Sequence, residues 1–156
     1  MKINTKLIVS LAIPQLAGLV GSVFTASALK SWYVELAKPA LNPPSWIFGP
    51  VWTTLFVLMG IALYLVWKKL PTNKHAKTGL VLFGVQLGLN VLWSVLFFGL
   101  RSPGIAFIEI VFLWLAILAT IVSFAKVSKK AAWMLVPYIL WVSFASYLNY
   151  SIFILS

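Results

Sequence analysis

The chain has 156 residues, of which 62% are hydrophobic and only 9% are charged, and its mean hydropathy is +1.03. Soluble globular domains carry about 25% charged residues, so this composition excludes a water-soluble globular protein. The formal net charge of +10 does not indicate a nucleic-acid partner, because the basic residues lie at the ends of apolar segments. Cysteine is absent, which excludes disulfides, thiolate metal sites and cysteine nucleophiles.

Five apolar segments follow one another along the chain, and each reaches the roughly 20 residues that a helix needs to cross a bilayer. They cover residues 6–29, 47–67, 79–100, 104–125 and 131–154. We therefore predict an all-α membrane protein, a five-transmembrane-helix bundle that forms a single domain over residues 1–156. The first segment is longer than a signal-peptide core and no small-residue cleavage site follows it, so we expect it to be retained.

The segment 32–52, between the first two spans, is unusually rich in rigid and flat side chains. These are Trp32, Tyr33, Pro39, Pro43, Pro44, Trp46, Pro50 and Trp52. A plain connector does not need this much stiff, amphipathic surface. We therefore predict that the aromatic and proline-rich loop is a lid over a pocket for a flat, apolar ligand.

The second and third spans have faces of different character. Residues on a helix advance by about 100° each, so one side of the second span carries Trp52, Phe56 and Met59. One face of the third span carries Gln86, Asn90, Trp93 and Phe97, and the opposite face carries Gly84 and Gly88. The polar and aromatic face of the third span is predicted to line the interior of the bundle. The two glycines have the small-xxx-small spacing that lets membrane helices approach closely, which predicts a homodimer interface; packing within the monomer is the alternative.

Glu109, in the fourth span, is the only acidic residue inside a predicted span. A charge at that depth costs at least ~2.5 kcal/mol, so such residues face the bundle interior and have a partner. The candidate partners are Arg101, Asn90 and the positive end of its own helix. Two roles remain open for Glu109, a structural hydrogen bond between helices and a proton relay.

In the fifth span, Trp141, Ala145 and Leu148 form one stripe, where a small alanine between large side chains leaves room for a ligand. Pro137 is expected to bend this helix, as Pro14 is expected to bend the first.

Tryptophans often anchor membrane proteins at the headgroups. Trp52, Trp93 and Trp141 instead share faces with polar or small residues, which favours a pocket, with simple packing as the alternative.

The basic residues divide unequally between the two ends of the predicted bundle, and cytoplasmic ends carry the excess of Lys and Arg. One end has Lys2, Lys6, Lys68, Lys69, Lys74, Lys77, Lys126, Lys129 and Lys130, and the other has Lys30, Lys38 and Arg101. We therefore predict a cytoplasmic N-terminus, an external C-terminus and an external lid.

Signals for ordinary catalysis are weak. The single histidine, His75, lies in a lysine-rich loop, and the two carboxylates are far apart in sequence. No phosphate-binding loop or metal-ligand spacing is present. The sequence therefore predicts neither a metal site nor a cofactor.

The chain resembles the TspO/MBR family, which comprises tryptophan-rich sensory proteins and the mitochondrial translocator protein, or peripheral benzodiazepine receptor. The resemblance extends in order over nearly the whole chain. It rests on Trp32-Tyr33, Lys38-Pro39, Pro43-Pro44, Gly49-Pro50-Val51-Trp52, Gln86, Asn90, Trp93, Phe97-Phe98-Gly99, Pro137-Tyr138, Trp141, Phe144-Ala145 and Leu148-Asn149-Tyr150.

The resemblance implies a five-helix bundle, often homodimeric, that binds porphyrins such as protoporphyrin IX and flat drugs. It implies a receptor or carrier linked to tetrapyrrole homeostasis or stress. Separately, the use of eleven Lys against one Arg favours a prokaryotic cell membrane. The pocket residues carried over by motif are Tyr33, Pro43, Trp52, Phe56, Asn90, Trp93, Trp141 and Ala145. Lys30 and Lys38 are expected to meet porphyrin propionates.

Two alternative functions remain open. The first is light- and oxygen-dependent degradation of protoporphyrin, with Trp52 and Trp141 as the reactive indoles that the resemblance implies. The second is proton-coupled export of hydrophobic compounds through Glu109. High-affinity sterol binding is not expected, because no basic residue follows Tyr147 or Tyr150, as the family's animal sterol pattern requires.

Overall fold

The computed structural model describes residues 4–156, and every regular element within that range is helical. The long helices are α1 (Thr5–Lys30), α2 (Phe48–Trp67), α3 (Ala76–Ser94), α4 (Pro103–Ala125) and α6 (Val136–Leu155). The short elements are η1 (Tyr33–Glu35), η2 (Ser45–Ile47), a π-helical turn η3 (Val95–Gly99) and α5 (Lys129–Met134). Five stretches are long and apolar enough to span a membrane, namely Thr5–Lys30, Ser45–Trp67, Ala76–Gly99, Pro103–Ala125 and Lys129–Leu155. The predicted five-span, all-α bundle is confirmed.

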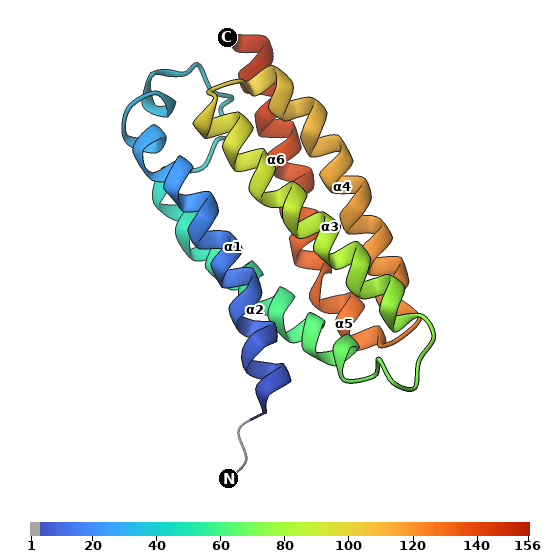
Figure 1. Ribbon diagram of the computed structural model, residues 1–156. Coiled ribbons are helices and arrows are strands. Elements are labelled where there is room, and N and C mark those ends of the chain that lie inside the picture. The colour runs from blue at the N-terminus through green and yellow to red at the C-terminus, as the bar shows by residue number, and fades with distance from the viewer. Residues whose placement is uncertain (1–3) are drawn as a thin grey trace.

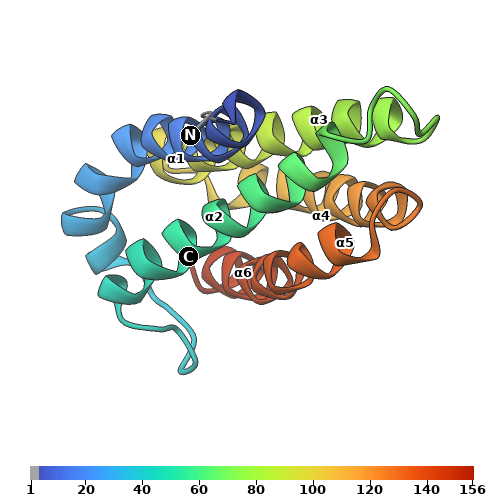
Figure 2. The same ribbon diagram turned by 90° about the horizontal axis from the view of Figure 1, so that it is seen from below.

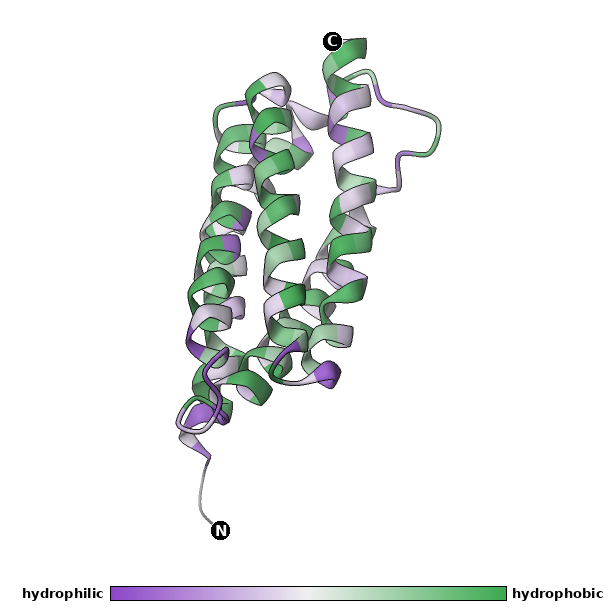
Figure 3. Cartoon of the chain, turned by 90° about the vertical axis from the view of Figure 1, so that its right-hand side faces the viewer, coloured by the Kyte–Doolittle hydropathy of each residue, from purple (hydrophilic) through white to green (hydrophobic). Residues whose placement is uncertain are grey.

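The helices run along one direction, with the lid loop and the C-terminus at one end and the N-terminus at the other (Figure 1). α1 packs against α2 and α3, α3 packs against α4, and α4 packs against α6. α2 runs obliquely across the bundle, so that its second half meets α5 (Figure 2). The ribbons of the long helices are coloured mostly hydrophobic, and hydrophilic stretches lie at the lower end and in the loops at the upper end (Figure 3).

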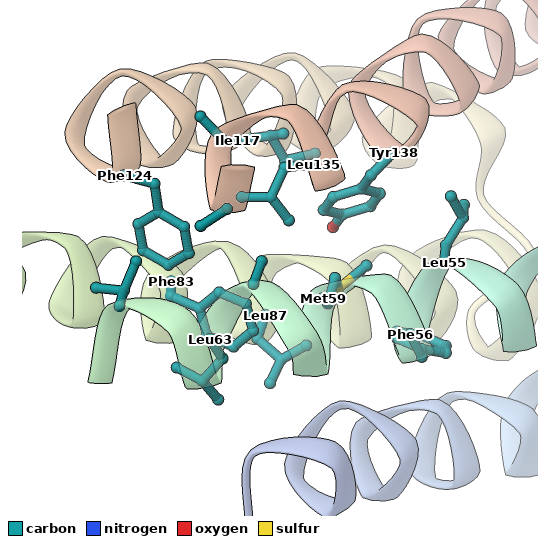
Figure 4. Packing of buried hydrophobic residues seen from close by; sticks show 14 of the residues in the cluster. Leu55, Phe56, Met59, Leu63, Phe83, Leu87, Ile117, Phe124, Leu135 and Tyr138 are labelled. Atoms are coloured by element: carbon teal, nitrogen blue, oxygen red, sulfur yellow. The ribbon is translucent and has the colours of Figure 1, made fainter. Parts of the chain in front are cut away.

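The larger cluster of buried side chains extends over α2, α3, α4, α5 and α6. Phe83 of α3 stacks on Phe124 of α4, with ring centroids 6.0 Å apart and planes at 7° (Figure 4). Met59 of α2 and Ile117 of α4 are fully buried in the same cluster. These side chains fill the interior between α2, α3 and α4.

α1 is held against α2 by a close backbone approach at Gly60. A Cβ atom at this position would lie 2.8 Å from the carbonyl oxygen of Ser10 and 2.9 Å from Cα of Leu11. Real Cβ atoms essentially never come so close to backbone atoms. Only glycine lets the two helices cross at this distance.

Three helix starts carry side-chain caps, which satisfy backbone N–H groups that have no partner within the helix. Asn4 accepts a hydrogen bond from the Leu7 amide (3.2 Å), Ser102 from the Ile105 amide (3.4 Å), and Ser128 from the Ala131 amide (3.2 Å).

Arg101, just before α4, has a φ of 53°, a left-handed conformation that reverses the chain within a short turn.

The last span departs from the continuous, bent helix expected around Pro137. It consists of α5 and α6, which meet at Leu135, and Pro137 lies in the first turn of α6. Proline fits there because first-turn amides have no acceptor within the helix. Pro14, by contrast, lies inside α1, and α1 continues through it.

The glycine face of α3 is unoccupied within the described chain. A Cβ atom at Gly84 or Gly88 would have nothing within 4 Å among the described residues, apart from its own helix and neighbours. The glycines therefore do not serve packing within the monomer. This leaves the face available to another helix.

Candidate functional site

A cavity of about 490 Å³ lies beneath the lid, between α1, α2, the end of α3 and α6. Pockets for small molecules and cofactors have volumes of about 300–1,000 Å³. Its lining has no Lys, Arg, Asp or Glu among residues 4–156. The principal large side chains that line it are Tyr33, Phe48, Trp52, Phe56, Trp93, Phe97, Phe98 and Trp141.

Three indoles, each supported by a neighbouring ring, form the aromatic part of the wall. Trp52 stacks on Phe56 with centroids 5.6 Å apart, and Trp93 stacks on Phe97 at 5.0 Å. Trp141 meets the ring of Phe48 edge-on at 6.2 Å. Offset and edge-to-face pairs of this kind stabilise each other beyond the area they bury. The rings therefore form a wall of defined shape.

α1 contributes a further wall, in which small residues outnumber the larger Gln15, Leu19 and Leu29. Gly18, Gly21, Ser22, Thr25 and Ala26 all line the cavity. The hydroxyls of Ser22 and Thr25 donate to carbonyls of their own helix, those of Leu19 (2.7 Å) and Gly21 (3.0 Å). This wall was missed in the sequence, although spacings of three and four residues place these small side chains on one helical face.

Asn149 of α6 holds one indole in place. Its Oδ1 accepts a hydrogen bond from Nε1 of Trp93 (2.9 Å), and its Nδ2 donates to the carbonyl of Pro103 (2.7 Å). Asn149 is 1% exposed, so both bonds lie away from water. The amide therefore links α3, α4 and α6 and sets the orientation of the Trp93 ring.

A second polar connection lies behind the cavity wall. Asn90, which lines the cavity, donates from Nδ2 to the hydroxyl of Tyr138 (2.8 Å), and this hydroxyl donates to Oε1 of Gln86 (2.7 Å). Trp52 meets the ring of Tyr138 edge-on at 6.3 Å. The cavity side chains Asn90 and Trp52 therefore both rest on one buried tyrosine.

The lid reaches the cavity through Tyr33, which is 3% exposed. Its hydroxyl donates to Oδ1 of Asn42 (2.9 Å), and burial raises the pKa of this phenol above its ordinary value, although the bond to Asn42 partly offsets the effect. Lys38 Nζ donates to the carbonyls of Tyr33 (2.7 Å) and Leu36 (3.0 Å) and lies 4.8 Å from the centre of the Tyr33 ring. These contacts give the loop a fixed shape.

A family model described as the TspO/MBR family matches residues 10–155 of the chain. The chain belongs to the TspO/MBR family. A tryptophan-rich protein TspO from Chlorobaculum tepidum is 50% identical over 139 residues, covering 86% of this chain and 85% of that protein. A tryptophan-rich protein TspO from Archaeoglobus fulgidus is 42% identical over 97% of both chains. The human translocator protein is 41% identical over 140 residues, 89% of this chain and 83% of that protein.

Most of the residues that the TspO/MBR motifs single out come together at this cavity. Seven of the eight line it, namely Tyr33, Trp52, Phe56, Asn90, Trp93, Trp141 and Ala145. Pro43 is not part of the lining. Lys30 and Lys38 do not line it either, and the ammonium of Lys38 is engaged by carbonyls of the lid. The expected contact of Lys38 with a propionate therefore competes with a role in holding the lid.

Glu109, in the fourth span of this TspO/MBR chain, is buried without a partner. It is 7% exposed, and neither carboxylate oxygen has a hydrogen-bond partner among residues 4–156. The expected bonds to Arg101 or Asn90 are therefore not formed, and the Nδ2 of Asn90 is directed to Tyr138 instead. Glu109 is also absent from the cavity lining.

Proposed function

We propose that the cavity binds a tetrapyrrole such as protoporphyrin IX, or another flat apolar ligand. The protein would act as a membrane receptor or carrier in tetrapyrrole homeostasis or the stress response. The observation that carries the proposal is that Trp52, Trp93 and Trp141 line one cavity that has no charged side chain among the described residues. Membership of the TspO/MBR family supports it further.

The chemistry of the wall suits a porphyrin ring. A flat π-system gains from the apolar area it buries and from offset or edge-to-face contacts with indoles. Its propionates are charged and would remain at the mouth, because a buried carboxylate without a partner is costly. The ligand is therefore expected to enter ring first, with its propionates last.

Titration of the purified protein with protoporphyrin IX in the dark, followed by tryptophan fluorescence, tests the proposal. We expect saturable quenching at one site per chain, because three indoles line the cavity. Quenching that rises linearly with porphyrin, without saturation, would contradict binding in this cavity.

Degradation of the bound porphyrin is a second candidate function, because both indoles implied in that chemistry, Trp52 and Trp141, line the same cavity. An excited porphyrin and molecular oxygen would supply the oxidising power, so no acid–base side chain is needed. We expect Trp141→Phe to bind porphyrin in the dark within about threefold of wild type, because the two rings have similar apolar area. Under light and oxygen, the porphyrin spectrum should fade with wild type only. Equal fading with both proteins would remove Trp141 from the reaction.

Proton-coupled export through Glu109 makes a separate prediction. Glu109→Gln keeps the size of the side chain and removes the ionisable group, and Glu109 does not line the cavity. We therefore expect unchanged dark binding of porphyrin and an equal or higher thermal midpoint at neutral pH, since a buried, unpartnered carboxylate is costly. Loss of pH-driven porphyrin flux in vesicles, with binding retained, would support export. Retained flux would exclude Glu109 as the coupling group.

We also propose an orientation and an assembly. The lysine-rich end would face the cytoplasm of a prokaryotic cell and the lid would face outward, as the distribution of basic residues favours. The open face at Gly84 and Gly88 would meet its copy in a second chain.

A further inference from the structure

A second hollow, on the outside of the bundle, lies between α3 and α4 at the lysine-rich end. It has a volume of about 430 Å³. Its lining residues are His75, Thr78, Leu82, Leu115, Leu118, Ala119, Val122, Ser123 and Lys126. We refer to it as the α3–α4 groove. It has no residue in common with the aromatic cavity.

The groove is backed by the contact between α3 and α4. Behind it, α3 and α4 pack so closely that a Cβ atom at Gly79 would lie 3.0 Å from the ring of Phe124. The stacked rings of Phe83 and Phe124 are buried in the core and do not line the groove. The sides remain open to the surroundings, since Leu115 and Val122 are 51% and 52% exposed. The groove is therefore a furrow along the surface of the bundle.

The length of the groove matches one leaflet of a bilayer. Lys126 and Leu115 lie eleven positions apart on α4, which corresponds to about 16 Å at 1.5 Å per residue. The hydrocarbon core is about 30 Å thick, so one leaflet contributes about 15 Å. The polar residues His75 and Lys126 are at the outer end of this path, and the leucines lie toward the bilayer centre.

The cations at this end have no acidic side chain to balance them. The whole chain has two acidic residues, Glu35 and Glu109. Glu35 belongs to the lid at the opposite end, and Glu109 is buried within α4. The exposed residues Lys77 and Lys126 therefore lie in a region of uncompensated positive charge. A second copy of this chain has the same two acidic residues and would add no counter-charge at this end.

We propose that the α3–α4 groove is a binding site for an anionic phospholipid. One acyl chain lies along Leu82, Leu115 and Leu118, and the phosphate is held by Lys126 with His75 beside it. Juxtamembrane lysines attract anionic lipids, and basic pockets between transmembrane helices hold their headgroups. This site is independent of the ligand proposed for the aromatic cavity.

Native mass spectrometry of the detergent-purified protein tests the site, with phosphatidylglycerol as probe and phosphatidylcholine of the same acyl chains as comparison. We expect one phosphatidylglycerol to bind per chain well before phosphatidylcholine does. Lys126→Glu should weaken this binding at least about tenfold. The matched control is Lys130→Glu, an exposed lysine at the same end that does not line the groove, and it should retain the lipid.

A second pair of variants tests the acyl-chain half of the site without changing charge. Ala119→Phe fills the groove and should also lose the bound lipid, whereas Ala12→Phe, at an exposed position of α1 outside the lining, should keep it. Equal binding of the two lipids, or equal affinity in Lys126→Glu and Lys130→Glu, would overturn the proposal. So would displacement of the lipid by inorganic phosphate alone, which would reduce the site to an anion site.

Discussion

Replacing Ala145 by phenylalanine is expected to abolish saturable dark binding of protoporphyrin IX, with affinity lowered on the order of a hundredfold, or about 2.7 kcal/mol. Ala145 lines the cavity one turn from both Trp141 and Asn149. A phenyl ring at this position takes the volume that a planar ligand needs, and the surrounding rings are already packed against one another. Tryptophan-fluorescence titration in the dark measures the change.

The control for this prediction places the same ring elsewhere. Ala12→Phe adds a phenyl group at an exposed position of α1 that does not line the cavity, so its affinity should equal that of wild type. Circular dichroism and the thermal midpoint would establish that both variants are folded. Wild-type affinity in folded Ala145→Phe would place the porphyrin site outside this cavity.

The second large effect, a loss of thermal stability, is expected on substitution of Gly60, where the backbones of α1 and α2 cross. Gly60→Ala forces α1 away from α2, because the added Cβ overlaps the carbonyl oxygen of Ser10 and Cα of Leu11. Overpacking of this kind typically costs about 1–3 kcal/mol, and Gly60→Leu should cost more. Thermal unfolding in detergent, followed by circular dichroism, measures the loss.

Gly49→Ala, in the first turn of α2, is the matched control for stability, since a Cβ atom at this position meets nothing within 4 Å among the described residues outside its own helix and neighbours. It should unfold at the wild-type temperature or slightly above it, because alanine favours a helix over glycine. Because α1 forms one wall of the cavity, Gly60→Ala should also weaken porphyrin binding. Equal midpoints for the two variants would show that the α1–α2 crossing accommodates the added Cβ atom without loss of stability.

The arrangement of five spans was predictable because it depends on apolar runs that are continuous in the sequence. The same holds for the cavity-lining faces of the third and fifth spans, where Asn90, Trp93 and Ala145 recur at helical spacing. A helix period brings such residues to one side whatever their neighbours are. These parts of the site depend on local geometry alone.

Other parts depend on contacts between distant segments. The role of α1 was not predicted, because small residues such as Gly18 and Gly21 become a wall only when an aromatic face lies across from them. The position of Pro137 at a helix start depends on the break at Leu135, which its sequence neighbours do not mark. The Lys38 ammonium is engaged by lid carbonyls because of how the loop folds. The Glu109 carboxylate has no hydrogen-bond partner among residues 4–156, and the Nδ2 of Asn90 donates to Tyr138.

The π-helical turn at η3 couples two parts of the molecule that look separate. Neighbours on an α-helix point about 100° apart, yet Phe97 and Phe98 are both buried, at 2% and 7% exposure. Phe97 stacks on Trp93 in the cavity wall and also meets Trp32 of the lid edge-on at 5.5 Å. Phe98 lies 5.9 Å from the ring of Tyr33. The cavity wall and the loop above it therefore share one set of aromatic contacts, so a change in the position of either ring would alter the packing of both.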